Sequence, residues 1–459
     1  MSISDLRARA LDVFSAALDA AHPHQLIRRA LQLQGTILRV QGVYGVQLGL
    51  GLKEAAPVIE LDLSGLGRVV AVGAGKATAP MARALEEVLE DRLEGGVVSV
   101  KYGHGCELDR VQLREAGHPI PDQAGLDATA EILDLLEELG PEDLAFVLIS
   151  GGGSALLDAY PEEIVLEDAR RTFDVLIGSG APIHEINVVR KHISRVKGGQ
   201  LARAASPARV IALVLSDVIG DPLPSIASGP TVPDPSTFAD AVGVLKDRGV
   251  WDDVPVPVRE HLERGVRGEV PETPKPGEEG WDRHRTLLVG NSRLAVEAAA
   301  DRARSLRLRP RVVTTILEGE AAEVGARLAG LLKESSATGA MAEPPFCLIC
   351  GGETTVTLGP SPGRGGRNQE LALAAALELE GSEGLVLLSG GTDGTDGPTD
   401  AAGGLVDGGT VARGRAEGME ATDHLERHDA YPFLEATGDL IRTGPTMTNV
   451  MDLVLLLSE

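Results

Sequence analysis

The stretch RVVAVGAGKATAPMARALEEVLEDR, residues 68–92, decides the fold class. Its opening run, Arg68–Val72, is short and apolar, which is typical of a buried strand. A glycine turn follows, and the remainder is rich in Ala, Leu and Glu, which favour a helix. The stretch is therefore predicted to be a strand–turn–helix unit with Lys76 in its turn.

The same alternation recurs along most of the chain. Strand LAFVLIS runs into Gly151-Gly152-Gly153-Ser154, and strand RVIALVLS runs into a long irregular loop. Apolar strands that alternate with helices predict parallel sheets covered on both faces. The first 65 residues differ, because Leu6–Leu18 and Leu26–Leu38 have the apolar spacing of helices.

Residues 265–281, GVRGEVPETPKPGEEGW, interrupt the alternation with proline, glycine and acidic residues. Such a composition without periodicity is typical of a linker or a long surface loop. We therefore expect an α/β protein with two doubly wound domains and mainly parallel sheets. The N-terminal domain, 1–264, would hold the glycine-rich lysine loop, and the C-terminal domain would span 282–459.

The overall charge limits the choice of partners. The chain of 459 residues carries 43 basic and 68 acidic side chains, a net charge of −25. A field of that sign repels nucleic acid and anionic membranes, so neither is an expected partner. No apolar run approaches the roughly 20 residues that cross a bilayer, and the N-terminus lacks a signal-peptide pattern. A cytoplasmic location is expected, and a homodimer stays open.

Two glycine turns are candidate anion sites. Gly73 and Gly75 would let backbone N–H groups approach a phosphate, with Lys76 adding a full charge. Val70 stands where a Walker A loop needs its first glycine, and Thr78 breaks the dinucleotide fingerprint. A tight turn with a solvated lysine is the alternative reading. Gly151–Gly153 with Ser154 form the second candidate, although Ser154 also suits a plain helix N-cap.

Cations and acids supply the remaining candidates. Arg190, Lys191 and Lys197 lie on a predicted helix and suit a carboxylate or phosphate, unless that face is merely solvated. Arg364 and Arg367 lie in GRGGRN before another helix, where planar guanidinium groups also suit such anions.

Acidic residues gather in two loops of the sequence. Asp217 and Asp221 follow a strand, and Asp393 and Asp396 lie in GTDGTDGPTD. Either pair is suited to hold Mg²⁺ or to accept a hydroxyl proton, although Asp also favours turns. The second loop lacks the spacing of an EF-hand. Anion-binding turns, cations and acids at strand ends together suit phosphoryl transfer.

Nine motifs, in this order, resemble those of the glycerate 2-kinases with a MOFRL-type C-terminal domain. They run from about Arg68 to Leu457 and are VGAGKA, GHPIPD, LISGGGSALL, NVVRKHISRVKGGQLA, SDVIGDPLPSIASGPTVPD, GGETTVTLG, GGRNQELAL, GTDGTDGPTDAAG and GPTMTNVMDL. The resemblance implies ATP-dependent phosphorylation of D-glycerate at its 2-hydroxyl, a requirement for Mg²⁺ and an active site in a cleft between the domains. It also places the functional lysine and arginine of the family at Lys76 and Arg367.

The resulting hypothesis gives each candidate a role. The catalytic residues would be Lys76, Arg367 and Asp217. The cofactor ATP would contact Gly73, Gly75, Gly151, Gly152, Gly153 and Ser154. The substrate D-glycerate would contact Arg190, Lys191, Lys197 and Arg364. Mg²⁺ would be held by Asp221, Asp393 and Asp396.

Two other functions stay open at this stage. One is an NAD(P)H-dependent hydroxypyruvate reductase, which the incomplete dinucleotide fingerprint disfavours. The other is a non-catalytic binder of a small phosphorylated metabolite.

Overall fold

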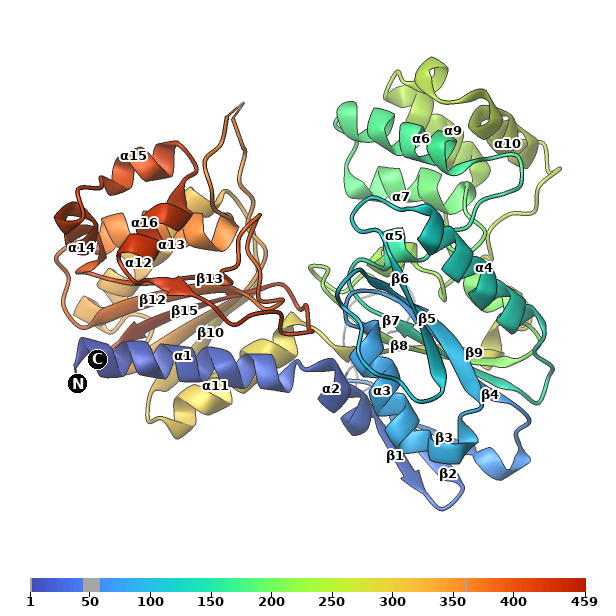
Figure 1. Cartoon of the computed structure of the whole chain (residues 1–459), viewed down its shortest axis with the longest axis horizontal. Coiled ribbons are helices and arrows are strands. Elements are labelled where there is room, and N and C mark those ends of the chain that lie inside the picture. The colour runs from blue at the N-terminus through green and yellow to red at the C-terminus, as the bar shows by residue number, and fades with distance from the viewer. Residues whose placement is uncertain (1, 44–57, 360) are drawn as a thin grey trace. The chain divides into compact units, whose positions relative to one another are not determined.

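The computed structural model describes residues 2–43, 58–359 and 361–459, and the chain divides into two compact units (Figure 1). The larger unit is Pro23–Gly290. The smaller unit combines the N-terminal segment through His22 with Asn291–Glu459. Part of the N-terminal region expected to be helical, residues 44–57, lies outside the described residues.

The larger unit is built on a six-stranded sheet of order β6-β5-β4-β7-β8-β9. Every neighbouring pair in this sheet is parallel. The strands are β4 (Val69–Ala74), β5 (Gly95–Lys101), β6 (Val111–Ala116), β7 (Leu144–Ile149), β8 (Arg209–Leu215) and β9 (His284–Gly290). The central strands β4 and β7 are buried throughout, as near-continuous apolar runs predict. The α/β class is confirmed.

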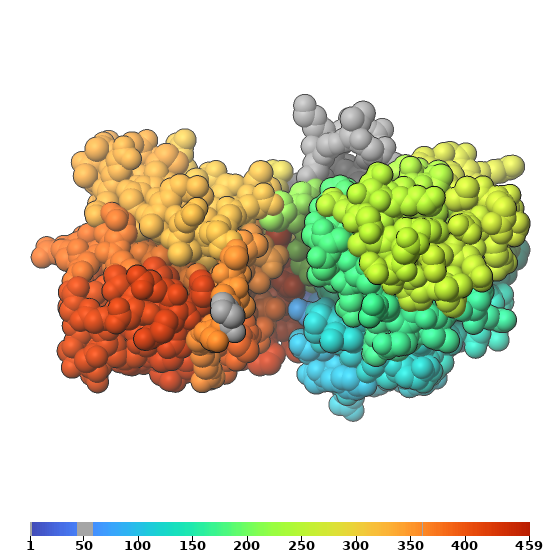
Figure 2. All heavy atoms as spheres, turned by 90° about the horizontal axis from the view of Figure 1, so that it is seen from above, coloured from blue at the N-terminus to red at the C-terminus, as the bar shows by residue number. Residues whose placement is uncertain are grey.

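In the larger unit, α2 (Pro23–Ala30) precedes the sheet, and the other helices lie between its parallel strands. These are α3 (Thr78–Leu89), α4 (Gln123–Glu137), α5 (Gly153–Leu156), α6 (Leu166–Gly178), α7 (Ile183–His192), α8 (Gln200–Ala204), α9 (Phe238–Asp247) and α10 (Val256–Val266). Helices α6, α7, α9 and α10 bury a core of their own, which includes Phe173, Val189, Phe238 and Leu262. They form a separate helical layer in Figure 1, and α9 and α10 cover much of this unit's face in Figure 2, in yellow-green.

A small antiparallel sheet follows α2, where the sequence favoured a helix through Leu38. Its strands are β1 (Leu31–Gln34), β2 (Ile37–Gln41) and β3 (Val58–Asp62). The helical prediction was wrong here because Leu38 and Val40 are buried alternately, with a period of two. Gly35, at φ 63°, turns β1 into β2.

The smaller unit contains a six-stranded sheet of order β10-β11-β15-β12-β13-β14. Its strands are β10 (Arg309–Leu317), β11 (Phe346–Gly352), β12 (Leu385–Gly391), β13 (Gly403–Asp407), β14 (Leu440–Ile441) and β15 (Asp452–Ser458). Its helices are α1 (Ile3–Ala20), α11 (Ser292–Ser305), α12 (Ala321–Thr338), α13 (Arg367–Leu379), α14 (Thr410–Ala416), α15 (Ala421–Glu426) and α16 (Ala430–Ala436). Helices α1 and α11 cover one face of the sheet, and α12 and α13 the other (Figure 1).

This second sheet is mixed, whereas we expected it to be mainly parallel. Only β10 and β11 pair in parallel, while β15 inserts between β11 and β12 and runs antiparallel to both. The last apolar run of the chain returns to the middle of the sheet, which the local pattern of that run cannot reveal. Among the described residues, no helix combines the length and the apolar character required to cross a membrane.

The division into units also differs from the expected boundaries. Residues 265–281 lie inside the larger unit, because the strand that follows them, β9, pairs with β8. Helix α1 belongs to the smaller unit, where Arg7 forms ion pairs with Asp407 at 2.5 Å and Asp439 at 2.8 Å. The chain therefore enters the larger unit after His22 and leaves it at Gly290.

Candidate active site

The carboxyl edge of the larger sheet gathers the polar residues that follow β4, β5, β6 and β7. Lys76 lies in the turn between β4 and α3, Lys101 ends β5, and His118 follows β6. The side chains of His118 and Lys76 both lie close to Gly152. A Cβ atom at that position would lie 2.8 Å from His118 Cδ2 and 3.4 Å from Lys76 Cγ. This edge is the usual ligand site of open parallel sheets.

The turn that carries Lys76 is held by hydrogen bonds within the protein. The N–H of Gly75 donates to Ser99 O at 3.1 Å, that of Lys76 to Gly151 O at 2.8 Å, and that of Ala77 to Ser150 Oγ at 3.0 Å. Because these donors are occupied, the turn around Gly75 does not form the predicted phosphate nest. Its remaining means of binding an anion is the side chain of Lys76, which is partly exposed.

Both glycines before Lys76 instead permit close packing. Gly73 belongs to β4, where a Cβ atom would lie 2.1 Å from Leu148 O. Gly75 has φ 142°, and its Cβ would lie 2.1 Å from Ser150 Oγ. The assignment of both glycines to ATP is therefore corrected to a structural role, since any side chain there would push β7 and its following turn away.

The second glycine turn offers backbone donors. Among residues 58–359, no acceptor bonds the N–H groups of Gly151, Gly152 or Ser154, whereas Gly153 donates to Ser150 O at 3.2 Å. Gly152 has φ 82°, a left-handed conformation that suits glycine. These N–H groups lie next to Lys76 and suit an anionic oxygen.

A chain of hydrogen bonds links Ser154 to Arg190. Ser228 Oγ donates to Asn187 Oδ1 at 3.1 Å, so the 3.0 Å contact between Ser154 Oγ and Ser228 Oγ has Ser154 as donor. Arg190 also donates to Asn187 Oδ1, at 2.9 Å, and lies over the ring of Phe173. Burial lowers the pKa of Arg190, although it stays charged. Arg190 is thus connected to the glycine turn, while Ser228 and Asn187 had received no role from the sequence.

Lys197 and Lys191 are corrected from substrate ligands to structural residues. Lys197 is fully buried, donates to Leu157 O at 2.7 Å and forms an ion pair with Asp158. Lys191 is 6% exposed and pairs with Asp234 at 3.2 Å. Helical spacing predicted that Arg190 and Lys197 share one face, but α7 ends at His192 and Lys197 lies beyond it, fully buried.

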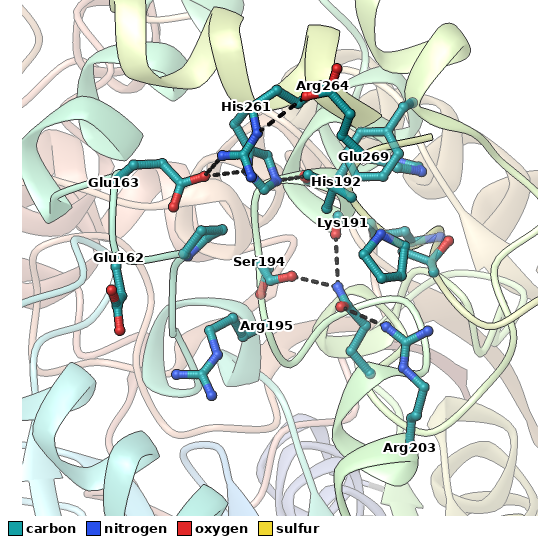
Figure 3. Close-up of a pocket in the computed structure, with 16 residues that line it drawn as sticks. Glu162, Glu163, Lys191, His192, Ser194, Arg195, Arg203, His261, Arg264 and Glu269 are labelled. Atoms are coloured by element: carbon teal, nitrogen blue, oxygen red, sulfur yellow. Dashed lines mark hydrogen bonds and ion pairs between the residues drawn. The ribbon is translucent and has the colours of Figure 1, made fainter. Parts of the chain in front are cut away.

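Lys191 also lines a cavity of about 410 Å³ on the helical side of the larger unit (Figure 3). His192, Arg203, His261 and Arg264 contribute to the same cavity. Its cationic groups already have protein partners: Arg264 pairs with Glu163 at 2.7 Å, and Arg203 donates to Glu272 O at 2.8 Å. Lys76, His118 and the glycine turns do not line this cavity.

Asp217 and Asp221 lie in the loop after β8, at the same edge of the sheet as Lys76. Both are partly exposed. Asp221 has φ 54°, and its N–H donates to Val218 O at 3.1 Å, so it shapes a turn as its sequence context suggested. No group of three or more His, Cys, Asp or Glu suited to a metal occurs in the part of the chain that the structure describes.

In the smaller unit, Arg367 begins α13 and is oriented by two carboxylates. It makes two hydrogen bonds to Asp452, at 2.6 and 2.9 Å, and an ion pair with Glu353 at 3.0 Å. These partners raise the pKa of Arg367 against the effect of burial. Arg367 lines a cavity of about 470 Å³ together with Glu353, Glu370, Asp396 and His428. Sequence patterns assigned no role to these two acids, although Glu353 follows a buried strand and Asp452 begins one.

Asp396 is corrected from a metal ligand to a helix cap. Its carboxylate accepts the N–H groups of Asn368 at 3.1 Å and Gln369 at 2.9 Å, at the start of α13. Gln369 Nε2 adds a further bond at 3.0 Å. Burial, with the nearby charge of Asp452, raises the pKa of Asp396 to about 6. Both oxygens already accept hydrogen bonds, which leaves little capacity for an ion.

Asp393 and Arg364 have different surroundings. The Oδ1 atoms of Asp393 and Asp452 lie 3.4 and 3.5 Å from the Cβ position of Gly391, so both carboxylates border the end of β12. Arg364 is exposed and stacks on the ring of Tyr431 at 3.9 Å, outside the cavity that Arg367 lines. The substrate contact expected for Arg364 therefore stays a prediction.

Two family models cover most of the chain. Residues 9–263 match a domain of unknown function, DUF4147, and residues 346–452 match the MOFRL family. The glycerate 2-kinase of Pyrococcus horikoshii is 43% identical over 99% of this chain and 98% of its own length. The chain belongs to the glycerate 2-kinase family. The D-glycerate 2-kinase of Thermotoga maritima is 44% identical over 88% of this chain and 93% of its own length.

A solved structure agrees with this membership. The glycerate kinase of Thermotoga maritima superimposes with a TM-score of 0.85, at 38% identity, over 99% of this chain and all of that one. The family resemblance that the nine motifs indicated is therefore confirmed. In this family member, each unit carries one of the two cations expected to be functional, Lys76 in the larger and Arg367 in the smaller.

Proposed function

We propose that this protein transfers the γ-phosphoryl group of ATP to the 2-hydroxyl of D-glycerate, giving 2-phosphoglycerate and ADP. The observation that carries the proposal is the match to glycerate 2-kinases along nearly the whole chain. The edge of the larger sheet supports it, because Lys76 lies there beside N–H donors that an anion could engage. The reaction would take place in the cytoplasm on small-molecule substrates, and a homodimer stays open.

The roles that we propose for individual residues follow from the positive charge or the N–H donors that each one offers to an anionic substrate. Phosphoryl transfer depends mainly on positioning and on neutralising the charge of the transferring group. Lys76 would supply one positive charge, with the N–H groups of Gly151, Gly152 and Ser154 as further donors. Arg367, oriented by Asp452 and Glu353, would supply the second charge in the same reaction. Arg190 would contact the glycerate carboxylate.

Magnesium is the proposed metal cofactor, and the acids of this chain are compatible with it. Mg²⁺ commonly uses one or two carboxylates together with substrate phosphates, so a dedicated cluster is not required. Asp393, close to Asp452, fits this pattern in the smaller unit, and Asp217 with Asp221 are the candidates in the larger. A bound magnesium ion would shield the charge of the phosphates.

Phosphorus NMR with ATP, Mg²⁺ and D-glycerate tests the reaction and identifies the product isomer. We expect the 2-phosphate. Oxidation of NAD(P)H with hydroxypyruvate, without any phosphorylated product, would instead identify a reductase. Calorimetric binding of a phosphorylated metabolite without ADP release would identify a non-catalytic binder.

Variants test the two cations. Lys76→Met and Arg367→Met should each lower kcat about a hundredfold or more, because each removes charge stabilisation from the transition state. The matched controls are Lys246→Met, at an exposed lysine that stacks on Trp251, and Arg304→Met, at an exposed arginine of α11. Both controls should keep kcat within about twofold, since surface substitutions away from a site have small effects. Near-normal kcat in Lys76→Met or Arg367→Met would remove that residue from the mechanism.

A further inference from the structure

His118 occupies a central position at the edge where Lys76 lies. Its ring packs against Gly152, so closely that a Cβ atom there would lie 2.8 Å from Cδ2 and 2.9 Å from Nε2. The same Cβ position is 3.4 Å from Lys76 Cγ. The imidazole of His118 and the side chain of Lys76 therefore both lie close to the backbone at Gly152. They lie beside the N–H groups of the second glycine turn.

Among the residues that the structure describes, the charged groups that shift the pKa of His118 are all cationic. They are Lys76 from the β4–α3 turn, Lys101 from the end of β5 and His104 from the loop that follows. The glycine turn after β7 carries no ionisable side chain. The two nearest acids along the chain already accept hydrogen bonds, Glu115 from the N–H of Gly103 and Asp122 from Tyr102, Gly117 and Gly125. Neither of them is among the groups that shift the pKa of His118.

These surroundings keep the imidazole neutral. Burial, followed by the charges of Lys76, Lys101 and His104, lowers the pKa of His118 to about 4. A neutral imidazole has a nitrogen lone pair that is able to accept a proton. An anion bound beside Lys76 would offset the cationic field and raise the pKa of His118 back toward its ordinary value, which improves it as a base.

We propose that His118 contacts the acceptor substrate and takes the proton of the hydroxyl that is phosphorylated. This inference rests on the proposed kinase function and adds a residue to it. The hydroxyl oxygen forms a bond to the γ-phosphorus of the nucleoside triphosphate, and the bond from that phosphorus to the leaving oxygen of ADP breaks. The hydroxyl proton moves to an imidazole nitrogen and then to solvent.

The first test replaces the imidazole with an amide of similar size. His118→Gln should lower kcat about a hundredfold, within the range of general base catalysis, with a small change in KM. Wild-type kcat should fall as the pH drops through the pKa that His118 has in the substrate complex. This fall in kcat at low pH, the acid limb of the pH profile, should be absent in His118→Gln. His184→Gln, at an exposed histidine of α7, is the matched control and should behave as wild type.

Several results would overturn the proposal. A kcat within about threefold of wild type, or an unchanged acid limb in His118→Gln, excludes His118 as the proton acceptor. A change in KM alone would leave His118 as a binding group only, which also overturns it. Absence of product from the wild-type protein would refute the kinase function itself, and that measurement comes first.

A second test does not require turnover. The imidazole signal of His118, assigned by its loss in His118→Gln, is titrated by NMR with and without D-glycerate. We expect the pKa to rise by at least one unit when D-glycerate is present, and no rise would contradict contact with the substrate.

Discussion

Lys197 is fully buried, whereas Lys76 keeps part of its side chain exposed at the sheet edge. Burial of an ammonium group is costly unless a carboxylate and hydrogen bonds compensate it. Asp158 and the carbonyl of Leu157 provide that compensation for Lys197. The sequence shows two lysines near glycines, and only the burial and the ion pair in the folded chain identify Lys197 as structural.

Lys197→Met should therefore lower the free energy of unfolding by about 3 kcal/mol, because Asp158 would remain buried without its partner. Lys76→Met should change it by less than about 1 kcal/mol while abolishing most activity. Urea unfolding with matched activity assays measures both quantities. A Lys197→Met protein as stable as wild type would show that the buried pair contributes nothing.

Helix α13 depends on a cap from a distant loop rather than on its own preceding residues. Gly366 at its N-cap has no side chain, and a Cβ there would lie 2.3 Å from Asp396 Cγ. Because Gly366 has no side chain, Asp396 comes close to the helix start and accepts hydrogen bonds from two N–H groups of the first turn. The cap also fixes the start of the helix from which Arg367 projects.

The raised pKa of Asp396 predicts a pH-dependent stability. The folded protein takes up a proton at about pH 6, whereas the unfolded chain does so near 3.9. Between these values only the folded state is protonated at this site, so its contribution to stability rises as the pH falls. From pH 7 to 4, wild type should gain about 2 kcal/mol relative to Asp396→Ala.

Urea unfolding across this pH range measures the gain. Asp423→Ala, at an exposed acid of α15, is the control and should show a constant difference from wild type. A constant difference for Asp396→Ala as well would contradict the raised pKa.

At the scale of the whole molecule, the first helix and the last strand share one unit. Phe14 of α1 packs beside Gly390 of β12, where a Cβ atom would lie 2.8 Å from the ring. Arg7 and Arg413 together neutralise the buried carboxylates of Asp407 and Asp439. The N-terminal helix is therefore an integral part of the smaller unit.

Arg7→Ala should speed hydrogen exchange in α1 and β13 and leave β4 and β7 unchanged, because the lost ion pairs belong to the smaller unit only. The expected loss of stability is about 1 to 2 kcal/mol, since Arg413 still pairs with both carboxylates. Arg9→Ala is the matched control on the same helix, where Arg9 donates to the carbonyl of Leu306 and the loss should be smaller. Exchange that accelerates equally in both units would refute the assignment of α1.

Local patterns in the sequence were sufficient for the strand–turn–helix units and for the positions of Lys76 and Arg367. Parallel strands that need two covered faces must be apolar and must alternate with helices, so their order can be read along the chain. Ordered motifs also determined the family. Residues that follow such strands necessarily meet at one edge, which is why the first candidate site was found at all.

Other features were decided only by contacts between distant segments. These are the place of β15 between β11 and β12, the membership of α1, the buried pairs of Lys191 and Lys197, the cap from Asp396 and the setting of His118. Burial and pairing depend on residues hundreds of positions apart, and a local pattern contains no information about them. The sequence by itself therefore determined which residue types reach the site, and the tertiary structure decided which of them remain available to a ligand.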